Sequence, residues 1–128
     1  MLKKRIIPVL LLQEGRMVKG KNFKDYVDTG NPISQVKIYT AQYTDELMFI
    51  DIQASLNSRK TLLNIISSSA KESHMPFSVG GGIKSLTDIR EILAAGADKV
   101  LINTSAFENR DFIKQAVKKF GSQAIILG

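Results

Sequence analysis

The 128-residue sequence contains no cysteine and a single histidine, His74. Without cysteine the chain can form no disulfide, no thiolate zinc site and no cysteine nucleophile. One histidine also excludes a metal site built from several imidazoles. His74 directly precedes a short apolar segment, and we interpret it as a surface-loop residue. The sequence therefore predicts no metal centre.

The sequence also lacks an apolar run long enough to cross a membrane. Residues 6–12 are apolar and follow a basic N-terminus, which is the pattern of a secretory signal. However, polar residues follow them without a small-residue cleavage site, and the run is far shorter than the ~20 residues that a spanning helix needs. Continuous apolar runs are typical of buried strands in parallel sheets. We therefore interpret residues 5–11 as a strand and expect a cytoplasmic protein that does not bind a membrane.

The charge is unbalanced, with 18 basic and 12 acidic residues and a net charge of +6. Such an excess suits anionic small molecules, an acidic partner surface or nucleic acid. The basic residues are spread along the chain, and many lie beside acidic residues on expected helix faces. The sequence has no alternation of basic and aromatic residues of the kind that stacks bases. We therefore expect no nucleic-acid partner.

Two short apolar segments end in residues suited to holding an anion. Residues 77–79 are followed by three glycines, residues 80–82, and residues 99–102 are followed by Asn103 and Thr104. Glycines let backbone N–H groups approach a phosphate closely, and the helix expected after them would aim its positive end at the same place. The glycines alone would also fit a plain strand-to-helix turn. Two such neighbouring strand ends together predict a phosphate site.

Strand and helix patterns alternate along the whole chain. We expect strands at residues 5–11, 46–51, 76–79, 99–102 and 122–127, and helices at residues 31–42, 57–71, 85–95 and 109–120. Residues 13–31 form a long polar segment, which we interpret as a loop; loops of this length are usually functional or disordered. The alternation predicts an α/β fold with a parallel sheet in one domain.

An internal similarity favours a barrel over a doubly wound sheet. Residues 45–49 and 98–102 each begin with two charged residues, of which the first is an aspartate, and continue as an apolar strand. This predicts a repeat of two βα units, and no Gly-x-Gly-x-x-Gly motif follows the first strand. A closed (β/α)₈ barrel needs ~250 residues, so we expect residues 1–128 to form its N-terminal half, from the first to the fifth strand. Its open edges would favour a homodimer of half-barrels or aggregation.

Motifs spread over nearly the whole chain carry a resemblance to a known family. They are Gly15-Arg16, Val18-Lys19-Gly20, Asp45-Glu46-Leu47, Asp51-Ile52, Ala54-Ser55, Val79-Gly80-Gly81-Gly82-Ile83, Gly96-Ala97-Asp98-Lys99-Val100 and Ile102-Asn103-Thr104. The chain resembles the N-terminal half of the cyclase subunit of imidazole glycerol phosphate synthase, a (β/α)₈ barrel. The resemblance implies a glutaminase partner that supplies ammonia, a phosphorylated ribulosyl nucleotide as substrate, and no cofactor. The implied products are imidazole glycerol phosphate, for histidine, and a purine carboxamide.

The resemblance also implies roles for individual residues. Phosphate binding is assigned to Gly81, Gly82, Asn103 and Thr104. Lys19 would belong to a loop that closes over the substrate, and Asp51 would contact the substrate from the end of its strand. Ammonia would enter at a mouth lined by Arg5, Glu46 and Lys99, and Asp98 would lie at the glutaminase interface. The three mouth residues also stand at the starts of apolar strands. Since strand starts converge in a barrel, their alternating charges favour a ring of ion pairs over ordinary solvation.

Leu11 departs from the family pattern. It stands where the cyclase has the first of two catalytic aspartates, and leucine cannot transfer a proton; the second aspartate would lie beyond Gly128. Paralogues from surface-polysaccharide pathways are similar at residues 8–12, lack this acid, and conduct ammonia from a glutaminase to a separate sugar-amidating enzyme. Residues 18–20 instead resemble the histidine enzyme, so both functions stay open. The sister isomerase of histidine synthesis, another phosphate-binding barrel, would also need an aspartate near this position. Leu11 therefore counts against that enzyme as well as against the cyclase.

Overall fold

One seven-stranded sheet organises the computed structural model, which describes residues 3–22, 24–53 and 55–128. The strand order is β3-β2-β1-β4-β5-β6-β7. The strands are β1 (Val9–Gln13), β2 (Arg16–Lys21), β3 (Lys24–Gly30), β4 (Leu47–Asp51), β5 (Phe77–Gly80), β6 (Lys99–Ile102) and β7 (Ile125–Leu127). Strands β1, β4, β5, β6 and β7 are parallel. The predicted α/β fold with a parallel sheet is confirmed, and its arrangement is that of part of a TIM barrel.

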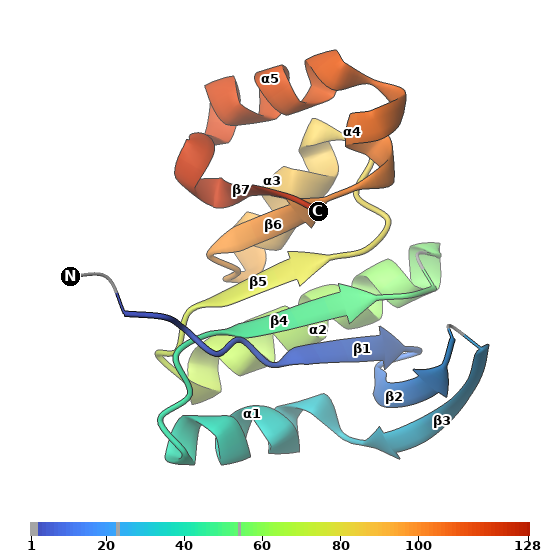
Figure 1. Ribbon diagram of the computed structural model, residues 1–128, viewed down its shortest axis with the longest axis vertical. Helices are drawn as coiled ribbons and strands as arrows, with labels where there is room; N and C mark the ends of the chain where they lie inside the picture. The colour runs from blue at the N-terminus through green and yellow to red at the C-terminus, as the bar shows by residue number, and fades with distance from the viewer. Residues whose placement is uncertain (1–2, 23, 54) are drawn as a thin grey trace.

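Helices alternate with the strands after β3 and cover one face of the sheet. They are α1 (Pro32–Ala41), α2 (Leu56–Glu72), α3 (Leu86–Ala95), α4 (Thr104–Glu108), α5 (Arg110–Phe120) and the 3₁₀ turn η1 (Ser122–Ala124). In Figure 1, α2 and α3 lie behind β4, β5 and β6. None of the described helices is long and apolar enough to cross a membrane.

The hydrophobic core lies between this helical layer and the sheet. Phe49 and Val79 are fully buried on the sheet side, and Ile66, Ile89 and Ile92 are fully buried on the helices. Each such side chain stabilises the fold by roughly 2 kcal/mol relative to an exposed one. Because strand side chains alternate between faces, burying these residues directs the residues between them to the opposite face.

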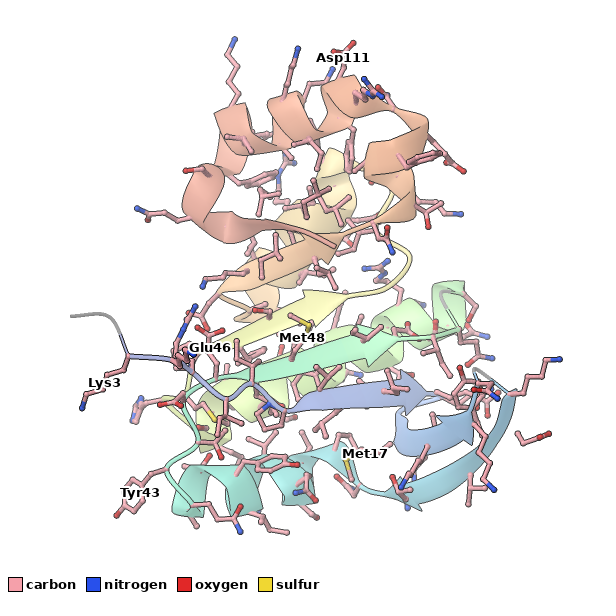
Figure 2. The ribbon with its side chains drawn as sticks, viewed as in Figure 1. Lys3, Met17, Tyr43, Glu46, Met48 and Asp111 are labelled. Atoms are coloured by element: carbon pink, nitrogen blue, oxygen red, sulfur yellow. The ribbon has the colours of Figure 1, made fainter. Side chains whose placement is uncertain are left out.

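The opposite face carries apolar side chains that no described helix covers. Leu11, Ile50, Leu101 and Ile126 belong to one lateral row, linked by the pairing of neighbouring strands, and all four are partly exposed. Met48 lies two residues before Ile50 on the same face and is drawn in front of the sheet in Figure 2. We call these five residues the open face.

The segment expected to be a long polar loop is instead a β-hairpin. Strand β2 pairs antiparallel with β1 and with β3. The β1–β2 turn contains Glu14 and Gly15, both with positive φ. The prediction was wrong because the segment lacks regular apolar alternation. An edge hairpin needs little of it, since β2 contributes one well-buried apolar side chain, Met17, to the core.

Apart from shifts of one or two residues at most boundaries, three further differences separate the predicted elements from the observed ones. The first strand begins at Val9 rather than at Arg5, because Pro8 lacks an N–H group for the ladder; the Pro8 carbonyl still accepts a hydrogen bond from Met48. Residues 122–124 form a 3₁₀ turn rather than the start of a strand. The short helix α4 was not predicted.

Candidate functional site

A pocket of about 400 Å³ lies at the carboxyl ends of β5 and β6. Its walls are formed by Ile50, Gly81, Gly82, Ile83, Lys84, Leu101, Asn103, Thr104, Ser105 and Glu108. The structure thus brings together all four residues predicted to bind phosphate. It does so because β5 and β6 are parallel neighbours, so that their carboxyl ends meet at one edge of the sheet.

The glycines at the end of β5 are required by backbone geometry. Gly81 and Gly82 have φ of 103° and 65°, a region that side chains disfavour. A Cβ on Gly81 would lie 2.0 Å from the carbonyl oxygen of Asp51, at the end of β4. The turn therefore packs directly against β4, and the amide N–H groups of Gly82 and Ile83 donate to no acceptor in the described part of the chain.

The start of α3 contributes less to this pocket than the sequence predicted. Ser85 and Asp88 form a capping box, in which Asp88 N donates to Ser85 Oγ at 3.1 Å. The N–H groups of Lys84 and Ser85 both donate to Asp88 Oδ2, at 2.9 and 3.1 Å. The Asp88 carboxylate therefore occupies these amides and offsets the positive end of the helix.

The second wall presents unused hydrogen-bonding groups. Asn103 precedes α4 in the N-cap position, where an asparagine side chain normally accepts from helix amides, yet its side chain makes no capping hydrogen bond. Both Asn103 and Thr104 are exposed. Lys84 and Glu108 place one exposed cation and one exposed carboxylate among the lining residues. Besides these two charges, the pocket offers neutral hydrogen-bond donors from Asn103, from Thr104 and from the amides of the glycine turn. Neutral donors of this kind suit a phosphate group.

A cluster of charges lies at the opposite, amino end of the strands. Glu46 directly precedes β4 and is 6% exposed. Its Oε1 forms an ion pair with Arg5 Nη1 and lies 3.7 Å from Nζ of Lys99, the first residue of β6. In Figure 2, Glu46 lies beside the start of β4, away from its arrowhead. The structure therefore brings together the three residues predicted to line the mouth of the barrel.

Asp51 and Asp98 lie outside both of these sites. Asp51 is buried, its Oδ1 accepts from Gln53 N at 3.0 Å, and its side chain faces Leu12 and Ser58 beside α2. Ile50, its neighbour on β4, lines the pocket instead. Asp98 is exposed at the amino edge and accepts from Phe77 N at 2.9 Å, which links the starts of β5 and β6.

Leu11 and Lys19 share a second pocket, of about 420 Å³, formed by β1, β2 and α1. Lys19 is exposed and lies on a strand of the hairpin rather than in a loop. Leu11 pairs with Val18 on one side and with Ile50 on the other. Lys19 thus lies on the hairpin that follows β1 and does not line the pocket at the carboxyl ends of β5 and β6.

The chain matches the model of a known protein family over nearly its whole length. A family model described as "Histidine biosynthesis protein" matches residues 5–128. The chain belongs to this family. The match covers the Arg5–Glu46–Lys99 cluster and the whole pocket, so both lie within the part of the chain that defines its family membership. The predicted histidine biosynthesis barrel family is confirmed, whereas the cyclase subunit and its paralogue stay predictions.

Two residues that contact the turn formed by Gly81 and Gly82 were not predicted. Arg59, on α2, donates from Nη2 to the carbonyl oxygen of Gly82 at 3.0 Å. Ser105 Oγ donates to the carbonyl oxygen of Ile83. Ser105 continues the polar run after Asn103 and could have been found from that run. Arg59 lies more than twenty positions before the glycines, so no local sequence signal connects them.

Proposed function

We propose that the chain is the N-terminal half of an ammonia-dependent cyclase barrel of histidine biosynthesis. The pocket at the ends of β5 and β6 binds one phosphate group of a phosphorylated ribulosyl nucleotide. The observation that supports this most is the placement of two sites on one parallel sheet. The donor-lined pocket lies at the carboxyl ends of the strands, and the charge cluster lies at their amino ends.

Ammonia from a glutaminase partner would enter at the charge cluster and move along the open face towards the pocket. Glu46 holds both Arg5 and Lys99, so passage requires at least one of these ion pairs to separate. Asp98 at the same edge is a position where the partner could dock. The open face beyond the cluster is apolar, which favours neutral ammonia over ammonium because a charge is costly to desolvate.

A second candidate function is favoured by Leu11. This side chain belongs to the apolar row with Ile50 and Leu101, and it cannot act as an acid or base. A protein with this lining would conduct ammonia from a glutaminase to a separate enzyme that amidates a sugar. It would bind no cyclase substrate productively.

Leu11→Asp in the complete barrel separates the two functions. Turnover of the ribulosyl intermediate with ammonium by the Leu11 protein itself would establish the cyclase and contradict our interpretation of Leu11. Turnover that appears only in L11D would show that the natural protein is an ammonia-conducting scaffold. Ribulosyl nucleotide that fails to bind to either protein would refute the cyclase proposal.

We also propose that a second barrel half covers the open face. In a preparation of this chain alone, that half is a second copy, because each copy offers the same five partly exposed apolar side chains. Pairing two such faces would remove apolar surface from water and would pair the outer edge of β7, which is otherwise free to bind another strand.

A further inference from the structure

The peptide between Gly82 and Ile83 is held from outside the pocket by Arg59. The guanidinium Nη2 donates to the Gly82 carbonyl oxygen at 3.0 Å, so this carbonyl faces α2. The C=O and N–H of a trans peptide point in opposite directions, and the described chain contains no cis peptide. The Ile83 N–H therefore points away from Arg59. Since Ile83 lines the pocket, this N–H is available to a ligand there.

The next peptide is held at both of its ends. Its carbonyl, that of Ile83, accepts from Ser105 Oγ, and its N–H, that of Lys84, donates to Asp88. The Gly82–Ile83 peptide is different, because its carbonyl alone has a partner in the described residues. It also follows two glycines with positive φ, which can adopt other backbone conformations at little cost. Arg59 is thus the side-chain contact that fixes its orientation.

We propose that Arg59 is a positioning residue for the anion site, through which α2 fixes the Ile83 N–H towards a phosphate group. This inference rests on the proposed phosphate-binding function. A cation bonded to the carbonyl also polarises the peptide and makes its N–H a stronger donor. The Arg59 Nη1 atom is buried and donates to no acceptor in the described residues. Its positive charge is therefore poorly screened and adds to the attraction of a phosphate monoester.

The test is a titration of the 128-residue chain with inorganic phosphate, followed by ¹H–¹⁵N NMR of the Gly82, Ile83 and Thr104 amides. We expect phosphate to shift all three. Arg59→Ala should weaken phosphate binding about tenfold, the loss expected for one charge-assisted contact. Lys60→Ala, the matched control, removes the same charge from an exposed neighbour on α2 and should change the affinity by less than about twofold.

Arg59→Lys tests the role without removing the charge and covers the case in which Arg59→Ala fails to fold. Lysine should leave affinity between those of the wild type and R59A, with an altered Ile83 shift in the phosphate-free protein. Unchanged phosphate affinity in folded R59A or R59K would overturn the positioning role while leaving the phosphate site intact. A wild-type chain that binds no phosphate at these amides would refute both the phosphate site and the role of Arg59.

Discussion

The carboxylate of Glu46 lies 3.7 Å from Lys99 Nζ while its side chain is only 8% exposed. The same oxygen pairs with Arg5, so one buried carboxylate balances two cations from different segments. Removing it would leave the half-buried ammonium of Lys99 without an opposing charge. The cluster therefore has a structural role in joining the N-terminal segment, β4 and β6, in addition to the proposed role at the mouth of the barrel.

Glu46→Gln should destabilise the fold by about 1–3 kcal/mol, because a partly buried pair loses one partner. Urea unfolding followed by circular dichroism measures this change. The control is Glu72→Gln, which removes an exposed carboxylate 3.9 Å from Lys37 and should cost less than ~1 kcal/mol. Equal losses in the two variants would show that Glu46 is no more than a surface partner.

Gly81→Ala should be much more destabilising than Gly121→Ala. Both glycines have positive φ, 103° and 90°, so alanine is strained at either position by about 1–3 kcal/mol. Only at Gly81 would the new Cβ also collide with the Asp51 carbonyl oxygen, since no atom lies within 4 Å at Gly121. Thermal unfolding of the two variants measures the difference, and similar midpoints would contradict the close packing of the glycine turn on β4.

The hairpin carries an acid-sensitive ion pair between Arg16 and Asp28. Arg16 donates from Nε at 2.9 Å, and this hydrogen bond lowers the pKa of Asp28 below its ordinary value; the pKa of Arg16 is raised in turn. A lowered folded-state pKa gives stability that is present above the unfolded aspartate pKa of about 3.9 and is lost as pH falls through the folded value.

Arg16→Gln should therefore return the Asp28 pKa towards its ordinary value. Carboxyl ¹³C NMR between pH 2 and 6 measures the titration directly. Because both side chains are about half exposed, the effect on global stability should be small. An Asp28 pKa that is identical in the wild type and in R16Q would mean that the pair does not form in solution.

The open face predicts self-association. Light scattering during gel filtration should show a species of twice the chain mass, and Met48→Asp should shift it to the monomer by placing a charge on the paired faces. Ile38→Asp adds the same charge at an exposed apolar position on α1 and should leave the dimer intact. A wild-type chain that is monodisperse as a monomer at all concentrations would refute this assembly.

Much of the fold could be predicted because local chemistry determines it. Asn31 followed by Pro32 starts α1, and the Asn31 side chain accepts from Ile33 N. Gly96 ends α3 with φ of 128°. These signals act over a few residues and need no knowledge of the rest of the chain. The hairpin of β2 and β3 was missed because edge strands are stabilised by backbone pairing, which leaves little trace in the side-chain pattern.

The sequence by itself determined the alternation of strands and helices, the glycines and short polar side chains at the Gly81–Gly82 and Asn103–Thr104 segments on which the proposed anion site depends, and the absence of a proton donor at Leu11. Each of these depends on residue type and local order. Only the tertiary structure decided that Asp51 faces α2 while Ile50 lines the pocket, that Asp88 occupies the two amides that precede α3, and that Arg59 holds the Gly82 carbonyl. The direction of a side chain and the partner of a carbonyl depend on how distant segments pack, and packing brings together residues whose separation in the chain carries no signal.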